Sequence, residues 1–395
     1  MSNKLTVRDI DVAGKCVFCR VDFNVPLDGQ RVADDSRMRA SMPTLAVLVE
    51  RKARVVLASH LGRPKGKPSP ELSLRPVAAR LTELLGAEVA FPGDSIGDAV
   101  RETRDRLRPG EVMLLENLRF HRGEEANDAE FAQQLAALAE VYVNDAFGTA
   151  HRAHASTVGV PERVKPAAAG LLMERELEQL GKLLSDPASP FVAILGGAKV
   201  SDKIELIQNL MPRVDVFLIG GGMAYTFLKA AMHPVGRSLL EEDRTTLAKA
   251  LMERARRDGK DFVLPMDHVV TIDGADDRYR TTDNVDIMAN EAGVDIGPRT
   301  IEQFVRRIRS ARTVLWNGPV GRFEVETFSN GTRRVAEALA EASAITVLGG
   351  GDSVAAAQQF RVADRMTHVS TGGGAALEFL SGISLPGVEA LQDAP

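Results

Sequence analysis

Five apolar runs in the second half of the chain each end in a cluster of glycines. A short, continuous apolar run is typical of a parallel strand that is buried on both faces. Because parallel strands end along one edge of their sheet, the glycines should gather there and let a bulky ligand approach the backbone. The helices that follow would offer N–H groups to an anion, so the pattern predicts a phosphate or nucleotide site. The runs are FVAILGGAKVSDK from Phe191, VFLIGGGMAYTFL from Val216, TVLWNGPVG from Thr313, ITVLGGGDS from Ile345 and HVSTGGG from His368.

The length and composition indicate a soluble protein of two domains. The chain has 395 residues, more than one hydrophobic core usually supports, and 44% of them are hydrophobic. A net charge of −5 argues against a general binder of nucleic acid or of a membrane surface. No apolar run approaches the roughly 18 residues of a membrane span, and the N-terminal residues lack the apolar core of a signal peptide. We therefore expect a cytoplasmic protein with neither a nucleic-acid nor a membrane partner.

Cys16 and Cys19 form a C-x-x-C pattern, which leaves a redox or metal role open. A zinc site would require a second cysteine pair, and these are the only two cysteines in the chain. The segment also has the pattern of a strand, in which side chains three residues apart point to opposite faces. We expect two buried or half-buried cysteines in a reducing compartment.

Strand and helix patterns alternate along the first half as well, which implies βαβ units and a mostly parallel sheet. Between the halves lie residues 165–190, whose middle has a strong helical pattern that the segment from Asp186-Pro187 to Pro190 ends. We interpret it as a helix connecting two α/β domains. A single (β/α)8 barrel would be shorter and would not need this connector. The predicted strands of the first half are Cys16–Phe23, Arg54–His60, Glu88–Phe91, Glu111–Leu115 and Val141–Asp145, and its predicted helices are Met38–Lys52, Leu74–Leu85, Ile96–Leu107 and Asp128–Glu140.

Basic residues occupy the segments that follow these strands. Arginine suits phosphate and carboxylate because its planar fork donates two parallel hydrogen bonds. A single arginine is usually a solvated surface residue, but four arginines and two histidines in strand-end loops predict a site for a small, multiply anionic substrate. Arg20 lies within a strand, and pairing with a carboxylate inside the same site is one possibility for it. The basic residues of the loops are Arg37, His60, Arg63, Arg119, His151 and Arg152.

The standard nucleotide and hydrolase motifs are absent. The chain contains neither G-x-G-x-x-G nor a Walker A sequence, and the near match from Gly62 to Pro68 has proline where a magnesium-binding hydroxyl belongs. The segment from Gly351 resembles a nucleophile elbow but ends in alanine, and no triad partners stand out. His151 and His154 suggest metal ligands, but the neighbouring arginine would repel a cation.

Two lysines and two acids of the second half remain as candidates. If Lys199 and Lys203 lie on the first turn of a helix, they are neighbours four residues apart, and an anion between them would relieve their repulsion. An exposed lysine pair is the alternative. Asp352 directly follows a strand and three glycines, where a carboxylate can hold Mg²⁺ beside nucleotide phosphates. Glu324, after the turn that ends the Thr313 run, is a candidate ligand for ribose.

These segments, in this order, resemble the phosphoglycerate kinase family over essentially the whole chain. Motifs this long are highly specific. They are RVDFNVP (Arg20–Pro26), DDSRMR (Asp34–Arg39), SHLGRP (Ser59–Pro64), ENLRF (Glu116–Phe120), NDAFGTAHRAHAS (Asn144–Ser156), LGGAKVSDK (Leu195–Lys203), GGGMAYTFL (Gly220–Leu228), WNGPVGRFE (Trp316–Glu324), GGGDS (Gly349–Ser353) and STGGGAALEFL (Ser370–Leu380).

The resemblance implies reversible transfer of phosphate between 1,3-bisphosphoglycerate and ADP, which gives 3-phosphoglycerate and ATP, with Mg²⁺ as cofactor in a monomer. It also implies two Rossmann-like domains, each a three-layer α/β/α arrangement with a mostly parallel sheet. Residues 1–170 would bind 3-phosphoglycerate, and residues 171–380, which begin with the connecting helix, would bind the nucleotide. The C-terminal tail, residues 381–395, would pack back on the first domain.

The resemblance also implies roles for individual residues. Arg37, Lys199 and Lys203 would be catalytic, with Arg37 and Lys199 stabilising charge on the moving phosphoryl group, and Asp352 would carry Mg²⁺. The expected glycerate ligands are Asp22, Phe23, Asn24, Arg37, His60, Leu61, Gly62, Arg63, Arg119 and Arg152. The expected nucleotide ligands are Gly196, Gly197, Lys203, Gly220, Asn317, Glu324, Gly350, Gly351, Asp352 and Ser353.

Two rival functions follow from other readings of the same residues. A dehydrogenase with a divergent nucleotide site would need the missing fingerprint and a histidine–carboxylate pair for hydride transfer. A catalytically inactive nucleotide-binding scaffold would lack one or more of Arg37, Lys199, Lys203 and Asp352, and all four are present. One departure from the family pattern is Arg322, which replaces a more usual apolar residue and is expected to affect nucleotide affinity or contact a phosphate.

Overall fold

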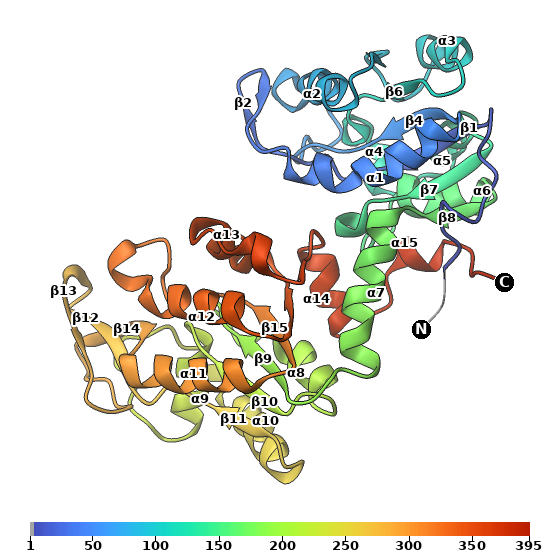
Figure 1. The fold of residues 1–395 in the computed structure, drawn as a ribbon. Helices are drawn as coiled ribbons and strands as arrows, with labels where there is room; N and C mark the ends of the chain where they lie inside the picture. The colour runs from blue at the N-terminus through green and yellow to red at the C-terminus, as the bar shows by residue number, and fades with distance from the viewer. Residues whose placement is uncertain (1–3) are drawn as a thin grey trace. The chain divides into compact units, whose positions relative to one another are not determined.

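The computed structural model describes residues 4–395. The chain divides into two compact units, one formed by the chain up to Glu178 together with Ser384–Pro395 and one formed by Gln179–Ile383. Each unit is built on a six-stranded sheet in which every paired strand runs parallel to its neighbours (Figure 1). The predicted pair of α/β domains with parallel sheets is therefore confirmed. Helix α7, Leu171–Ser185, is the predicted connecting helix and runs from the first unit into the second.

The first sheet has the strand order β5-β6-β4-β1-β7-β8. Its five predicted strands are present, although the first ends at Arg20 and not at Phe23. The sixth strand was not predicted, because Ala167–Ala169 was assigned to the connecting segment. These three alanines are buried and pair with β7 before the chain enters α7. The strands are β1 (Cys16–Arg20), β4 (Arg54–Ala58), β5 (Val89–Ala90), β6 (Val112–Leu114), β7 (Val141–Asn144) and β8 (Ala167–Ala169).

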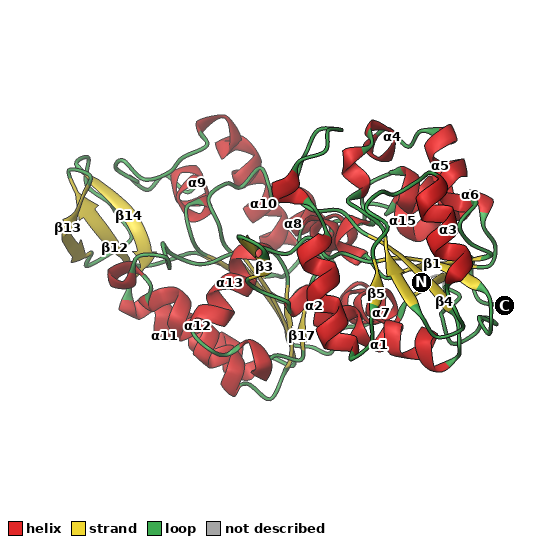
Figure 2. Ribbon diagram, turned by 90° about the horizontal axis from the view of Figure 1, so that it is seen from above, coloured by secondary structure: helices red, strands yellow, loops and turns green. Residues whose placement is uncertain are grey.

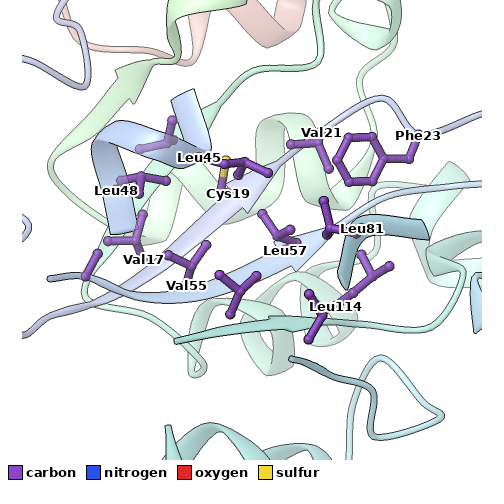
Figure 3. Packing of buried hydrophobic residues seen from close by; sticks show 14 of the residues in the cluster. Val17, Cys19, Val21, Phe23, Leu45, Leu48, Val55, Leu57, Leu81 and Leu114 are labelled. Atoms are coloured by element: carbon purple, nitrogen blue, oxygen red, sulfur yellow. The ribbon is translucent and has the colours of Figure 1, made fainter. Parts of the chain in front are cut away.

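Helices α1 and α2 cover one face of this sheet, and their apolar side chains meet those of β1 and β4 (Figure 3). Cys19 belongs to this core, whereas Cys16 is buried outside it, and both are free thiols. Burial raises the pKa of both thiols, which fits structural rather than redox cysteines. The helices of the first unit are α1 (Ser36–Glu50), α2 (Arg75–Leu85), α3 (Asp98–Arg106), α4 (Arg122–Glu125), α5 (Ala129–Ala136), α6 (Val160–Arg163) and α15 (Pro386–Glu389), and a small hairpin joins β2 (Leu27–Asp28) to β3 (Arg31–Val32).

The C-terminal segment contacts the strands and the N-terminal residues of the first unit. Lys4 Nζ lies 2.8 Å from a carboxylate oxygen of Asp393, and the backbone N–H of Gln392 donates to Ala167 O at 3.0 Å. The side-chain amide of Asn144, the last residue of β7, donates to Gly387 O at 3.2 Å. The end of the chain thus supplies part of the hydrogen bonding around β7 and β8.

The second sheet has the order β11-β10-β9-β15-β16-β17, which is the order of a Rossmann sheet. All five runs that end in glycines are strands of this sheet. Its strand order reverses between β9 and β15, the place where such sheets bind ligands. The strands are β9 (Phe191–Leu195), β10 (Val216–Ile219), β11 (Asp261–Val263), β15 (Thr313–Asn317), β16 (Ile345–Leu348) and β17 (His368–Val369).

Helices α11, α12 and α13 pack on one face of this sheet through a core that contains Trp316 and Phe304. A separate antiparallel sheet, β13-β12-β14, was not predicted (Figure 2). Its strands are β12 (His268–Ile272), β13 (Ala275–Thr281) and β14 (Glu291–Ile296), and the helices of this unit are α8 (Ile204–Leu210), α9 (Met223–Ala230), α10 (Thr245–Arg257), α11 (Pro298–Ser310), α12 (Asn330–Glu341), α13 (Gly351–Gln359) and α14 (Gly374–Leu380). Among residues 4–395, no helix has the length and apolar character needed to cross a membrane.

The connecting helix α7 begins on a buried carboxylate. Asp145 Oδ1 accepts hydrogen bonds from the backbone N–H of Leu172 at 2.9 Å and of Met173 at 3.4 Å, and Thr44 Oγ1 accepts from Leu171 N at 2.8 Å. A side chain at Gly170 would lie 2.1 Å from Asp145 Oδ1, so glycine is required for this approach. Burial raises the pKa of Asp145 from 3.8 to about 7, against the opposing effect of these hydrogen bonds.

This raised pKa predicts a pH-dependent stability. Between about pH 4 and pH 7 the folded protein keeps a proton on Asp145 that the unfolded chain releases, so the contribution of Asp145 to the free energy of unfolding falls as pH rises. Asp145→Asn keeps the Oδ1 acceptor but cannot titrate. We expect the melting temperature of the variant, relative to wild type, to rise as pH increases across this range, and a pH-independent difference would contradict the raised pKa.

Candidate active site

Residues that follow four neighbouring strands meet at the carboxyl edge of the first sheet. Strands β6, β4, β1 and β7 are adjacent in that order, so the loops after them are close in space although they are far apart in sequence. They carry Arg119, His60, Asp22 and Arg152, respectively, and Arg37 joins them from the first turn of α1. The basic strand-end residues named from the sequence therefore belong to one edge.

Asp22 and His60 occupy the centre of this edge. An Asp22 carboxylate oxygen accepts a hydrogen bond from Arg37 Nη1 at 2.8 Å, and the other lies 3.9 Å from His60 Nδ1. Burial, followed by the charges of Arg20, Arg119 and Arg37, lowers the pKa of His60 well below 6.5, so the ring is neutral. Arg20 Nη2 lies 3.2 Å from His60 Nδ1. Because arginine only donates, Nδ1 must accept, and Nε2 carries the proton.

The other predicted residues of this edge support the loops or lie on the surface. Asn24 Oδ1 accepts from Gly62 N at 2.9 Å, and Arg119 Nη1 donates to Gly62 O at 2.9 Å. Phe23 and Leu61 are buried in the hydrophobic core, so their contribution to a ligand site is through the backbone. Arg63 and Arg152 are exposed, and Arg152 Nε donates to His151 Nε2 at 3.1 Å.

Sequence reasoning missed the roles of Ser156 and Glu124, which connect to Arg20 behind this edge. Arg20 does not pair directly with a carboxylate, but its Nε donates to Ser156 Oγ at 2.9 Å, and that hydroxyl donates to Glu124 Oε1 at 2.6 Å. Glu124 has no accessible surface. Glu124 lies in the sequence RGEE, where a helix begins. Nothing in this local sequence distinguishes Glu124 from a solvated surface acid.

In the second unit, the glycines of the predicted nucleotide edge divide into two kinds. A Cβ at Gly196 would lie 2.0 Å from Pro319 O, and one at Gly220 would lie 2.6 Å from Val320 Cβ, so these glycines allow turns to pack on each other. A Cβ at Gly197 or at Gly351 would meet no atom within 4 Å. The second kind faces open space, which is where a ligand can approach the backbone.

Buried polar side chains tie the ends of β9, β15 and β16 together. Asn317 Nδ2 donates to Gly349 O at 2.8 Å, and Asn317 Oδ1 accepts from Lys203 Nζ. Ser353 Oγ accepts from Gly318 N at 2.6 Å. Burial lowers the pKa of Lys203, while the nearby charges of Asp202 and Asp352 oppose this effect. These contacts bring Lys203, Asn317 and Ser353 together at the point where the strand order reverses.

The two lysines are not on one helical turn. Helix α8 begins at Ile204, so Lys203 precedes it and the exposed Lys199 lies in the loop before that. The condition for their being neighbours on one helix face is therefore not met, since Gly197 adopts a φ of +101° and the chain makes further turns before the helix starts. Exposed Asp352 lies in the first turn of α13, and Glu324 is exposed after β15.

Arg322, the departure from the family pattern, is paired with the antiparallel sheet. Its two terminal nitrogens lie 2.9 and 3.0 Å from the two carboxylate oxygens of Asp276 in β13. Its guanidinium also lies over the ring of Phe328, 5.4 Å from the ring centroid. Both terminal nitrogens of Arg322 are therefore already bound to a carboxylate of the protein.

Within residues 4–395, no group of three or more His, Cys, Asp or Glu side chains is arranged to hold a metal ion. Mg²⁺ usually takes one or two carboxylates and completes its shell with water and substrate phosphates. The exposed carboxylate of Asp352, beside the open Gly351, fits a magnesium ion that arrives with a nucleotide rather than a resident metal.

A basic edge on one parallel sheet and a nucleotide-type edge on a Rossmann-ordered sheet define a two-domain phosphotransferase. Residues 7–383 match the family model described as phosphoglycerate kinase. The chain is 54% identical to the phosphoglycerate kinase of Acidobacterium capsulatum over 402 aligned positions, which cover 99% of this chain and 100% of that protein.

Two solved structures resemble the fold over nearly its whole length. Phosphoglycerate kinase from Coxiella burnetii has a TM-score of 0.89 at 40% identity, and the enzyme from Pyrococcus horikoshii has a TM-score of 0.84 at 34% identity. Each comparison covers 98% of both chains. The chain belongs to the phosphoglycerate kinase family, and it is a phosphotransferase of glycolysis.

The two kinds of glycine predict different responses to the same substitution. Gly196→Ala should destabilise the second unit by at least about 1–3 kcal/mol, because the new methyl meets a backbone oxygen that cannot move freely. Gly351→Ala should leave stability unchanged or raise it by up to about 1 kcal/mol, since the site is open and helical. Thermal melts of both variants test this, and equal destabilisation would contradict the division.

Proposed function

We propose that the chain catalyses the reversible, Mg²⁺-dependent transfer of a phosphoryl group from 1,3-bisphosphoglycerate to ADP, with the glycerate bound by the first unit and the nucleotide by the second. One observation carries this assignment, namely the chemical contrast between the two sheet edges. The first edge gathers arginines around a neutral histidine, which suits a small, multiply anionic molecule. The second combines open glycine turns with a lysine, which suits nucleotide phosphates.

The glycerate would be held by side chains that differ in their freedom. Arg119 is half-buried and bonded to a neighbouring loop, so it would grip the phosphate that does not react. Arg63 and Arg152 are exposed and would close on the ligand from the surface. His60 would donate its Nε2 hydrogen to a substrate oxygen. Asp22, Phe23, Asn24, Leu61 and Gly62 would shape the loops between them.

The nucleotide would lie across the glycine turns at the reversal of strand order. Gly197 and Gly351 would allow its phosphates to approach the backbone, with Gly350, Lys203 and Ser353 beside them. Glu324 would bind the ribose, and Gly196, Gly220 and Asn317 would hold the turns in place. Asp352 would hold Mg²⁺, which when bound neutralises phosphate charge.

The transfer requires no side-chain nucleophile. An oxygen of the ADP β-phosphate attacks the phosphorus of the acyl phosphate, the bond from that phosphorus to the carboxyl oxygen breaks, and the carboxylate leaves. The protein supplies in-line positioning, positive charge and exclusion of water. Arg37, Lys199 and Lys203 would provide the charge. Because the substrates are assigned to different units, we infer a hinge motion that involves residues 165–184 and 370–374.

One chain carries both edges, so the proposal needs only a monomer, and the two free cysteines support a reducing, cytoplasmic compartment. A coupled assay with ATP, Mg²⁺ and 3-phosphoglycerate tests the reaction directly. Turnover that requires all three components is the expected result. Absence of turnover in a well-folded preparation would instead favour an inactive nucleotide-binding scaffold.

Asp352→Asn should weaken binding of the Mg–nucleotide complex by about tenfold or more, because it removes a full charge that faces the metal. Binding of ADP without Mg²⁺ should change little. Asp364→Asn, at an exposed aspartate of the same unit, is the matched control. Titration calorimetry with and without Mg²⁺ measures both, and an unchanged affinity for Mg-ADP would remove Asp352 from the metal role.

Arg37 and Arg119 should differ in which kinetic constant they affect. Arg37→Ala should lower kcat by about 10³-fold, because its contact with the transferring group forms mainly in the transition state. Arg119→Ala should mainly raise the KM for 3-phosphoglycerate. The lost binding free energy should be roughly 1.5–3 kcal/mol, the contribution of a charged hydrogen bond. Arg37→Lys should restore little activity, since a point charge lacks the planar fork.

Arg39→Ala is the control for this pair, because Arg39 lies on the same helix, is exposed and pairs with Asp35 at 2.9 Å. Steady-state kinetics with each substrate varied, together with a thermal melt, separate the effects. A normal kcat for Arg37→Ala would transfer the charge-stabilising role to Lys199. A raised KM for ATP in Arg119→Ala would show that the ligands have been assigned to the wrong units.

A further inference from the structure

Glu124 is a fully buried acid whose two oxygens are both held by one residue. Its Oε2 accepts from the backbone N–H of Ser156 at 3.0 Å, and its Oε1 accepts from the Ser156 hydroxyl at 2.6 Å. His154 Nδ1 lies 3.8 Å from the same Oε1. Burial raises the pKa of Glu124, and the charge of Arg20 and the bonds from Ser156 oppose this effect. Ser156 lies in the short helical segment Ala155–Gly159, far from Glu124 in sequence.

The Ser156 hydroxyl has a fixed direction. Because its hydrogen goes to Glu124, its oxygen accepts, and the donor is Arg20 Nε at 2.9 Å. The segment itself is anchored, since the Tyr142 hydroxyl donates to Ser156 O at 2.8 Å. Arg20 is 1% exposed, so no water competes freely for its guanidinium.

A guanidinium that is held at two nitrogens has no rotational freedom left. Arg20 Nε is held by Ser156, and Arg20 Nη1 donates to Val21 O. Because the group is planar, the direction of Nη2 is then determined, and Nη2 lies 3.2 Å from His60 Nδ1. The orientation of Arg20 thereby decides which ring nitrogen of His60 keeps its hydrogen.

We propose that Ser156 and Glu124 are positioning residues of the glycerate site, which orient Arg20 so that neutral His60 presents an Nε2 hydrogen to the anionic substrate. The inference rests on the proposed role of His60 in binding the glycerate. Neither residue touches the substrate, and both act through Arg20. A hydroxyl relay suits this purpose because it aligns the guanidinium without a direct carboxylate partner that would draw it away from His60.

The direct test is the tautomer of His60, read from the nitrogen chemical shifts of histidine-labelled full-length protein without substrate. The chain has seven histidines, so the signals can be assigned with single variants. Wild type should show a hydrogen on Nε2 alone. Ser156→Ala removes the acceptor for Arg20 Nε and should give a mixture of tautomers, whereas Ser156→Thr keeps the hydroxyl and should restore the Nε2 form.

Kinetics give the second readout. Ser156→Ala and Glu124→Gln should raise the KM for 3-phosphoglycerate by about tenfold, the effect of a weakened charged contact, while the KM for ATP stays unchanged. Ser95→Ala is the matched control, since Ser95 is also buried in the first unit and its hydroxyl donates to Glu116 O at 2.7 Å. Ser95→Ala should lower the melting temperature without changing the His60 tautomer or either KM.

The outcomes distinguish the positioning role of Ser156 and Glu124 from the proposed function of the protein. A pure Nε2 tautomer in Ser156→Ala overturns the positioning role, and so does a Glu124→Gln variant with the tautomer and KM of wild type. The tautomer is measured without substrate, so it does not depend on the reaction. Failure of the wild-type protein to turn over 3-phosphoglycerate would overturn the proposed function and is recognised separately in the coupled assay.

Discussion

Every strand of the main sheet in each unit runs in the same direction, and the chemistry of both units depends on this constraint. Parallel strands need helical crossovers, so each strand ends at the same edge and the loops beyond it converge. In the first unit this brings Arg20, His60 and Arg119 together from three separate strand ends. In the second it places the turns after β9, β15 and β16 in contact. Neither cluster could form on a meander of antiparallel hairpins with the same residues in the same order.

Converging loops carry backbone groups that no sheet ladder satisfies, and both units solve this with a buried asparagine. Asn117 accepts from Leu61 N at 3.2 Å and donates to Leu61 O at 2.7 Å, so it acts as a local strand partner for the His60 loop. Asn317 donates to Gly349 O at 2.8 Å and accepts from Lys203. These bonds fix the loops before any ligand arrives, which lowers the reorganisation that binding and transfer require.

The sequence predicted the parts of this arrangement that depend on local pattern. The five glycine-terminated runs became strands of one sheet, and the basic loops meet at one edge, because burial and strand direction are encoded within a few residues. Lys199 and Lys203 do not lie on one helical turn, and β12, β13 and β14 were not predicted, since β13 is mostly exposed and polar. Glu124 and Arg20 both reach Ser156, across sequence separations of 32 and 136 residues, and no local signal reports contacts at that range.

The acids of the first unit explain how so many positive charges can share one edge. Arg37 is held at 2.8 Å by Asp22, Arg119 lies 3.3 Å from Glu125, and Arg20 reaches Glu124 through Ser156. Each of these three arginines therefore has a negative charge close by, which limits the repulsion that the folded chain must tolerate. An anionic substrate competes with these partners instead of meeting bare charge. Arg37 is partly exposed where it pairs with buried Asp22, whereas Arg20, Ser156 and Glu124 are all buried. The same edge therefore contains a contact that solvent and substrate can reach and a contact that is enclosed by the protein.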